Sequence, residues 1–193
     1  MTRSIIALAL AAALPLSAQA GEISYKYIEA GYASNHLDLG GGSGTLDGYD
    51  VKGSVAFNDS FYGNFSYTSG SKNSVDLDET VVGVGYRTAI SDKADFNASL
   101  SWVHDNLDIN NFGSASDDGY RVAVGVRGML ADKFEGNFNV NYTDAGDFGN
   151  GVGAGIGALV HINDTWGITA GYDYSNRDSI DLSTWNLGVR ASF

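Results

Sequence analysis

Alternation with a period of two dominates the chain from Tyr25 to its C-terminus. About ten segments of nine to twelve residues place apolar or aromatic side chains on one face and small or polar side chains on the other. The segment 134–143 is the clearest, because Phe134 and Phe138 alternate with Glu135 and Asn139. Successive side chains of a strand point to opposite faces, so the pattern predicts an all-β fold of about ten strands, with eight as the alternative.

The connections between these segments are of two alternating kinds. Short ones carry tight-turn residues at 58–60, 91–93, 131–133 and 163–165. Long ones, rich in Gly, Ser, Asn and Asp, are predicted near 35–48, 70–78, 105–118, 144–150 and 176–182. Short turns at one end, longer loops at the other and an even strand number predict an up-and-down antiparallel barrel.

The start of the chain has the pattern of an export signal. Arg3 precedes an apolar run from Ile5 to Leu16, and Ala18-Gln19-Ala20 has the small residues of a signal-peptidase site. We therefore expect a signal peptide over 1–20, cleaved after Ala20, and one barrel domain over 21–193. The run is too short to span a bilayer as a helix.

Composition beyond the leader excludes several classes of protein. The chain has no cysteine, and its one proline is Pro15, so a disulfide scaffold, a thiolate metal site and a cysteine nucleophile are excluded. Without Arg3 the chain has 10 basic and 23 acidic residues, a net charge of −13. Nucleic acid is not expected as a partner, because its binding requires a basic surface. Neither a metal site nor a cofactor is expected.

Bulky aromatic residues stand at both ends of the apolar face, as two girdles about one membrane thickness apart. Those beside the short turns are Phe57, Phe61, Phe96, Phe134, Trp166 and Phe193, and those near the long loops are Tyr49, Tyr67, Trp102, Tyr120, Tyr142, Tyr174 and Trp185. This arrangement favours a membrane barrel with its apolar face toward lipid over a soluble barrel with that face inward.

The opposite face carries equal numbers of acids and bases, as an enclosed lumen requires when unpaired ions are costly. This predicted lumen charge network consists of Asp50, Lys52, Glu79, Arg87, Asp95, Arg121, Arg127, Glu135, Asp173 and Arg190. Only the first strand, near 25–33, has an uncertain phase.

The last strand carries the most specific resemblance. Its alternate residues Trp185, Leu187, Val189, Ala191 and Phe193 resemble the C-terminal assembly signal of bacterial outer-membrane barrels. The chain resembles the small outer-membrane β-barrel superfamily that includes OmpX and the OmpA transmembrane domain. The opening 23–32 is similar to that of short xanthomonad-type barrels discussed as activators of plant immunity. The resemblance implies an outer-membrane location, contact with lipid and lipopolysaccharide, and insertion by the barrel assembly machinery.

Three functional classes follow from these residues. The long loops hold twelve Asp against Lys72 and Arg177, which favours a structural or surface-interaction role such as adhesion, envelope integrity or host contact. Glycines on the inward face of 153–171 offer an alternative, a narrow passive channel for small hydrophilic solutes or ions, although ion pairs could equally fill the lumen.

An enzyme is not expected. His36 falls in a predicted loop, His161 faces the lumen, and His104 faces outward while the adjacent Asp105 faces inward, so no nucleophile-and-base set emerges. The predicted loops also leave no room for the tall walls on which omptin-type proteases carry their catalytic residues.

Overall fold

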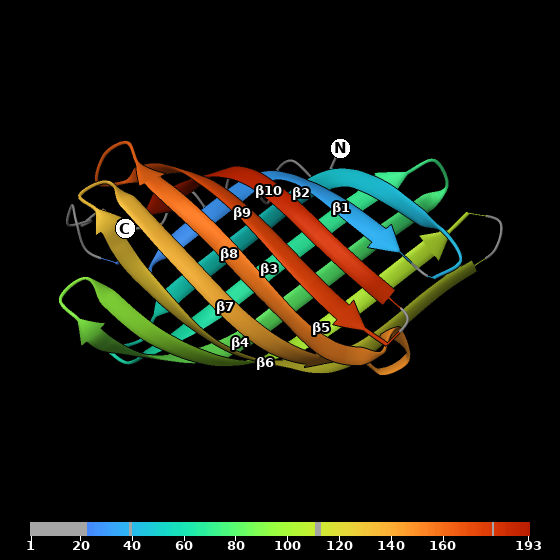
Figure 1. The fold of residues 1–193 in the computed structure, drawn as a ribbon, viewed down its shortest axis with the longest axis horizontal. Coiled ribbons are helices and arrows are strands. Elements are labelled where there is room, and N and C mark those ends of the chain that lie inside the picture. The colour runs from blue at the N-terminus through green and yellow to red at the C-terminus, as the bar shows by residue number, and fades with distance from the viewer. Residues whose placement is uncertain (1–22, 39, 111–112, 179) are drawn as a thin grey trace.

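The computed structural model describes residues 23–38, 40–110, 113–178 and 180–193; the expected signal peptide, 1–20, lies outside these residues. Ten antiparallel strands close into one barrel, in which each strand pairs with its sequence neighbours and β1 pairs with β10 (Figure 1). The expected up-and-down barrel of ten strands is confirmed, and the eight-stranded alternative is wrong. The strands are β1 (Tyr27–Asp38), β2 (Ser43–Ala56), β3 (Phe61–Lys72), β4 (Val75–Ser91), β5 (Ala94–Ile109), β6 (Gly113–Ala131), β7 (Phe134–Asp144), β8 (Asn150–His161), β9 (Trp166–Arg177) and β10 (Ile180–Ser192).

The inner end of the barrel is formed by four tight turns at the positions expected from the sequence. In the first, the Asn58 side chain accepts hydrogen bonds from the backbone N–H groups of Ser60 and Phe61. Asn163 does the same for Thr165 and Trp166. In these two turns an Asn side chain satisfies the turn N–H groups, and in the turn at 91–93 the Ser91 hydroxyl accepts from the N–H of Lys93 at 3.3 Å.

The outer end differs from the expected layout, because most of the predicted loop residues belong to strands. Beyond the girdle pair Trp102 and Tyr120, the β5–β6 hairpin continues for seven more residue pairs, up to Ile109 opposite Gly113. The outer connections shrink to 39–42, 73–74, 110–112, 145–149 and 178–179, and the 145–149 connection contains the short helix η1 (Gly146–Phe148). Composition rich in Asp, Ser and Gly suggests a loop, but cross-strand pairing satisfies the backbone of these segments and keeps them extended. The walls of the barrel therefore rise well beyond the outer girdle.

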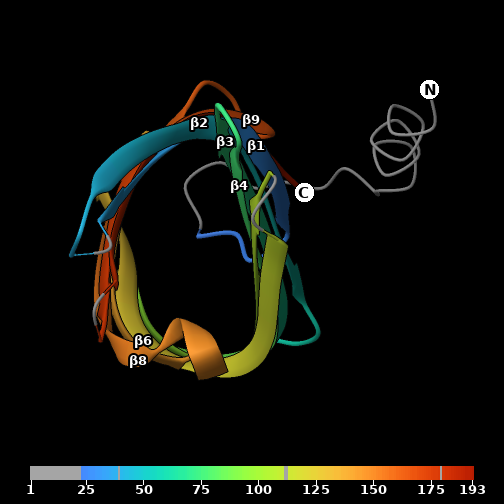
Figure 2. The same ribbon diagram turned by 90° about the vertical axis from the view of Figure 1, so that its right-hand side faces the viewer.

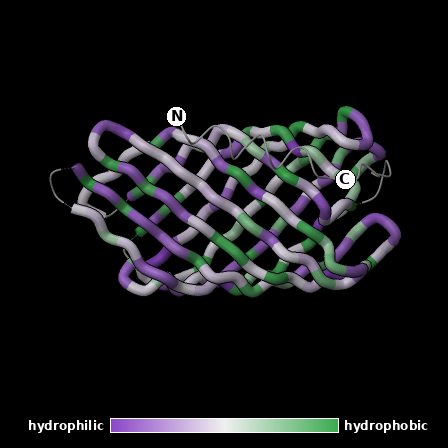
Figure 3. The backbone as a smooth tube through the Cα atoms, turned by 180° about the vertical axis from the view of Figure 1, so that it is seen from behind, coloured by the Kyte–Doolittle hydropathy of each residue, from purple (hydrophilic) through white to green (hydrophobic). Residues whose placement is uncertain are grey.

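The outward face carries an apolar band. Every strand has large, apolar, exposed residues on its outward face, as β6 has Val122 and Val124. Apolar and hydrophilic residues alternate along the strands (Figure 3). A continuous exposed apolar surface of this size needs lipid around it. Within the described part of the chain, no helix has the length and hydrophobicity to cross a bilayer.

The phase of the first strand is set by its neighbours. Glu29 and Asn35 of β1 are buried and line the lumenal cavity, whereas Tyr32 points outward. In the register of the barrel, Glu29 stands opposite Lys52 on one side and Arg190 on the other. This contact with two basic residues explains the inward phase.

Candidate functional site: the lumen and the outer rim

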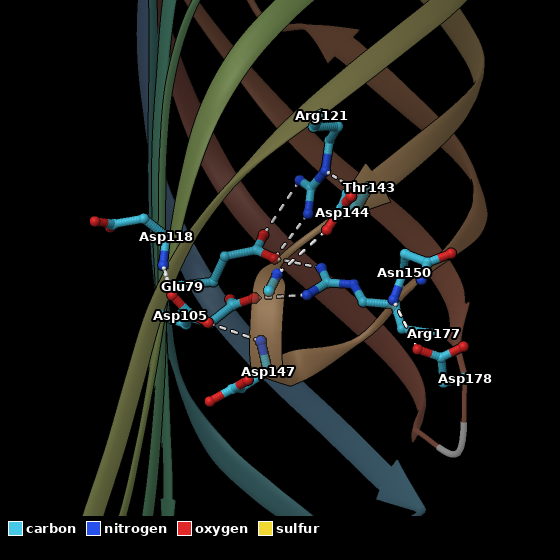
Figure 4. A network of polar contacts seen from close by, with 12 residues as sticks. Glu79, Asp105, Asp118, Arg121, Thr143, Asp144, Asp147, Asn150, Arg177 and Asp178 are labelled. Atoms are coloured by element: carbon cyan, nitrogen blue, oxygen red, sulfur yellow. Dashed lines mark hydrogen bonds and ion pairs between the residues drawn. The ribbon is translucent and has the colours of Figure 1, made fainter.

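The outer half of the lumen is crossed by a cluster of four charged residues, which we call the outer ion-pair cluster: Glu79, Asp105, Arg121 and Arg177 (Figure 4). Arg177 of β9 donates to Glu79 of β4 at 2.7 Å and to Asp105 of β5 at 2.6 Å. Arg121 donates to both carboxylate oxygens of Glu79, one of which it shares with Arg177, and its Nε donates to Thr143 at 2.9 Å. Since β9 and β4 lie five strands apart in a ring of ten, Arg177 bridges opposite walls.

The inner half of the lumen contains a second set, the inner ion-pair cluster: Glu29, Arg127, Glu135 and Arg190. Arg127 donates to both oxygens of Glu135, which is only 1% exposed. Arg190 donates through Nε to Glu29 at 2.9 Å, and its NH1 lies 3.8 Å from Glu135. His161 approaches Glu135 at 3.7 Å. These contacts connect β1, β6, β7, β8 and β10, so the inner lumen is also bridged by charge.

A polar chamber lies between the two clusters. The cavity has a volume of about 390 Å³, and its lining includes Arg177 and Glu79 of the outer cluster as well as Tyr25 and Arg127 near the inner mouth. Lys52 pairs with Asp50 at 3.0 Å and stands 4.0 Å from Glu29. Asp173 also lines the chamber, and among the described residues it forms no ion pair.

The inward glycines leave room for asparagine side chains of neighbouring strands. A Cβ at Gly157 would lie 2.6 Å from the amide nitrogen of Asn137, and one at Gly171 would lie 2.8 Å from Asn186. Gly153 faces Asn141 in the same way. The glycine positions are thus occupied by neighbouring polar groups and do not form a smooth empty wall.

Above the outer ion-pair cluster the lumen contains apolar residues that the sequence analysis did not identify. Leu37 and Leu46, on the outer ends of β1 and β2, are buried, and Leu46 is only 3% exposed. Val81 on β4 and Val103 on β5 are also buried, but they lie on the inner side of Glu79 and Asp105. Leu37 and Leu46 lie in the region expected to be a loop, so their inward phase was not considered; extending the period-two pattern past the girdle would have found it.

All ten residues of the predicted charge network lie on the inward side, but the network is larger than expected. Glu29, Asp105 and Arg177 also take part. The inward position of Glu29 was not predicted because the sequence does not define which face of its strand points inward. The role of Arg177 was not predicted because its segment has the composition of a loop. Asp105 was expected to face inward, yet its partner Arg177 is 72 residues away in the sequence.

The outer girdle residues point outward, and three of them, Tyr67, Tyr142 and Tyr174, contact a polar residue of the next strand. In each outer hairpin an aromatic residue of the first strand contacts an acidic or amide residue of the second. The contacts are Tyr32 to Asp47 at 2.6 Å, Tyr67 to Asp78 at 2.7 Å, His104 to Asp118 at 2.8 Å, Tyr142 to Asn150 at 3.2 Å and Tyr174 to Asp181 at 2.8 Å. Five equivalent contacts around the barrel mark the level at which apolar wall gives way to acidic rim.

Two histidines differ from expectation, one in its secondary structure and the other in its carboxylate partner. His36 belongs to β1, where its Nδ1 lies 3.1 Å from the Thr45 hydroxyl, and not to a loop. His104 is on the outward face, and its carboxylate partner is Asp118 of the next strand. The partner of His36 is therefore a threonine hydroxyl, and the partner of His104 is a carboxylate.

The remaining girdle residues and the last strand also face outward. Phe57, Phe61, Phe134 and Trp166 are exposed next to the inner turns, together with Ile90, Leu130 and Ile162, which the sequence analysis did not include. On β10, Trp185 is 64% exposed, and Leu187 and Val189 are exposed with it. Phe193 ends the chain, with its N–H donating to the carbonyl of Lys26 at 3.0 Å.

The rim, defined as the described residues beyond the outer girdle, brings like charges together on its outer wall. Asp76 of β4 stands directly opposite Asp108 of β5, and Asp38 of β1 opposite Asp181 of β10. Like charges opposite each other destabilise a strand pair. The basic residues of the described strands face the lumen, apart from Lys72 at the outer tip of β3.

Asp117 ties the 145–149 connection to the barrel wall. Its carboxylate accepts hydrogen bonds from the N–H groups of Asp147 at 2.7 Å and Asp118 at 2.8 Å (Figure 4). These two N–H groups hold the pKa of the Asp117 carboxyl below its ordinary value of 3.8. Since the folded pKa is the lower one, the contact stabilises the connection above pH 3.8 and is lost as the pH falls through the folded value.

We expect Asp117→Ala to release this connection without unfolding the barrel, because the side chain lies outside the membrane and its loss leaves the strand ladder intact. Amide hydrogen exchange at Asp147 should become faster at neutral pH. In the parent chain the same increase should appear only under acid conditions. Equal exchange in the parent and the variant at neutral pH would contradict this role.

A closed barrel with an apolar outer face and a charged interior is a transmembrane β-barrel. The chain matches the family model described as outer membrane protein beta-barrel domain over residues 6–151. This protein therefore belongs to the outer membrane β-barrel family, which resides in the bacterial outer membrane.

Solved structures with the same kind of fold are distant in sequence. Ail, the attachment invasion locus protein of Yersinia pestis, is 17% identical, with 89% of this chain and 100% of that chain covered and a TM-score of 0.47. Neisserial surface protein A is 14% identical, with coverage of 88% and 98% and a TM-score of 0.49. The NanC porin is 11% identical, with coverage of 87% and 100% and a TM-score of 0.48. Comparison with curated protein sequences finds no significant match.

Proposed function

We propose that this protein is a non-conducting outer-membrane barrel that acts through surface interactions of its acidic rim. The observation that carries the proposal is the bridging of the lumen at two levels. Arg177 joins opposite walls in the outer ion-pair cluster, and the inner ion-pair cluster links strands on both sides of the lumen. Buried Leu37 and Leu46 lie beyond the outer cluster.

The rim provides the chemistry for contact. Its carboxylates face outward beyond the outer girdle, and opposed pairs such as Asp76 and Asp108 favour a positively charged partner that relieves their repulsion. A complex of Ail with the heparin analogue sucrose octasulfate has been solved at 19% identity to this chain. A sulfated polyanion of that kind is an unfavourable partner for this rim, because both carry negative charge.

The first experiment is single-channel recording of the refolded barrel in a planar bilayer, with heat-modifiable gel mobility as proof of folding. We expect no conductance steps, because hydrated ions meet charged bridges at both levels. Reproducible steps from the parent chain would overturn the proposal and favour the alternative, a narrow passive channel, which the chamber of about 390 Å³ supports.

A second experiment tests the rim with a fluorescent oligolysine peptide as the probe and the barrel in vesicles of neutral lipid. The parent should bind the peptide in a salt-sensitive way. A rim variant with Asp76, Asp78, Asp108 and Asp118 changed to Asn should lose at least tenfold in affinity. The lumenal control Asp173→Asn should bind like the parent. Equal binding by the rim variant would contradict the assignment of the rim as the interaction surface.

A further inference from the structure

The first described residues do not lie along the barrel wall. Tyr25, two residues before β1, is 5% exposed and lies inside the inner mouth, with its ring centroid 4.8 Å from that of Tyr62. The guanidinium carbons of Arg87 and Arg127 lie 4.5 Å and 5.0 Å from the same ring centroid. A view along the barrel shows the blue start of the chain within the ring of strands (Figure 2).

The segment is also held by its backbone. The carbonyl of Ser24 accepts a hydrogen bond of 2.8 Å from Arg127. Arg127 belongs to β6, which lies five strands from β1 and therefore on the opposite wall. The Arg127 side chain thus reaches from the opposite wall to residues 23–26 at the inner mouth, and cation–π contacts with two guanidinium groups favour the position of the Tyr25 ring.

Tyr25 is at the same time the floor of the chamber. It lines the cavity together with Tyr62, Ser66 and Asp173. Arg177 and Glu79 of the outer cluster also line the cavity, and the apolar residues Leu37 and Leu46 lie beyond them. Displacement of Tyr25 would therefore connect the chamber with the inner mouth, while the outer end stays bridged.

The described lumen below the rim has one acid more than it has bases, and the acid without an ion pair there, Asp173, lines the chamber. Below the rim, the described inward side chains include seven acids, Glu29, Asp50, Glu79, Asp95, Asp105, Glu135 and Asp173, and six bases, Lys52, Arg87, Arg121, Arg127, Arg177 and Arg190. Asp50 is 2% exposed, and its carboxylate oxygens accept no hydrogen bond from the described residues, although Lys52 lies within ion-pair distance. Asp173 forms no ion pair there. An uncompensated carboxylate inside a membrane barrel attracts a cation.

We propose that residues 23–26 are a plug that closes the inner mouth of a lumenal chamber for small cations, with Tyr25 as the closing side chain. The chamber is a pocket that opens toward the periplasm when the plug leaves. It is not a passage, because the outer ion-pair cluster remains in place. The ligand class is a small hydrophilic cation, which Asp50 and Asp173 attract while the asparagine amides and hydroxyls of the wall solvate it.

The absence of cysteine from the chain allows a direct test of access. A single Ser66→Cys places a thiol on the chamber wall, and its reaction with a small cationic methanethiosulfonate reagent is followed in the folded barrel. We expect a slow reaction with Tyr25 present and a reaction at least tenfold faster in Tyr25→Ala. Tyr25→Phe should stay slow, because it keeps the ring that contacts the two guanidinium groups.

Controls separate access from other effects. Ser114→Cys, at the exposed tip of β6, should react at the same rate whichever residue stands at position 25. In the Tyr25→Ala background, the cationic reagent should react with the chamber thiol at least fivefold faster than an anionic reagent of similar size, and Asp173→Asn should remove that preference.

Two results would overturn the proposal. One is a fast reaction of the chamber thiol with Tyr25 in place, and the other is an equal rate with Tyr25 and with alanine. Equal rates of the cationic and anionic reagents, or a preference for the cationic reagent that Asp173→Asn leaves unchanged, would reject the cation class. If Tyr25→Ala fails to show the heat-modifiable mobility of a folded barrel, Tyr25→Leu serves instead, since it keeps an apolar side chain and removes the ring.

Discussion

Replacing Glu135 with alanine is expected to destabilise the folded barrel by about 3–5 kcal/mol, the usual cost of removing one partner from a buried ion pair. Glu135 is almost fully buried and accepts both hydrogen bonds from Arg127, while Arg190 and His161 lie within 4 Å of it. The variant leaves Arg127 with a buried charge and without the carboxylate that balances it. No nearby acid can take that place, because Glu29 already accepts from Arg190.

The measurement is the free energy of unfolding in urea, for the barrel folded in lipid or detergent. Asp95→Ala is the graded control, since Asp95 has one contact of 3.4 Å with Arg87 and is more exposed, so its loss should be smaller. Asp164→Ala, in an exposed inner turn, should have little effect. If Glu135→Ala lowers the free energy of unfolding no more than Asp95→Ala does, the inner ion-pair cluster does not stabilise the barrel as expected.

Arginine at position 124 is expected to prevent or strongly impair assembly. Val124 lies on the outward face of β6, 40% exposed, and pairs with Ala98 of β5 and Val140 of β7 near the middle of the apolar band. An arginine on the lipid face at mid-depth costs about 2–4 kcal/mol, whereas the cost near the interfaces is about 0–1 kcal/mol.

Assembly is measured by the fraction of protein with heat-modifiable mobility after insertion into lipid vesicles, and stability by urea unfolding of whatever assembles. Ser114→Arg, on the same strand at the outer tip, is the matched control and should assemble like the parent. Normal assembly of Val124→Arg with unchanged stability would show that the outward and inward faces had been exchanged.

The strand number and the two faces of the barrel could be predicted because both depend on local order along the chain. A strand presents side chains alternately to its two sides, so Val122 and Val124 on one side and Arg121 and Arg127 on the other already define a lipid face and a lumen face. The inner turns were also predictable, since Asn58 and Asn163 use their own side chains to satisfy neighbouring backbone N–H groups.

The extent of the outer walls was not predictable from composition. Segments such as 105–118 consist of residues that are typical of loops, and only pairing with the adjacent strand makes an extended conformation favourable for them. Composition therefore predicts loops at Leu37, Leu46 and Arg177, whereas the pairing of β1 with β2 and of β9 with β10 directs these side chains into the lumen.

Local alternation therefore determined the class of fold, the membrane-facing surface and the set of charged residues that share the interior. Closure of the barrel decided which of these charges meet. Arg177 and Glu79 are 98 residues apart, and Arg190 and Glu29 are 161 apart, so no local pattern relates them. The same closure brings β6 opposite β1, which allows Arg127 to hold Ser24 and Tyr25 across the inner mouth. The physical reason is that periodicity specifies the direction of each side chain, whereas its partner depends on which strands the ring places opposite each other.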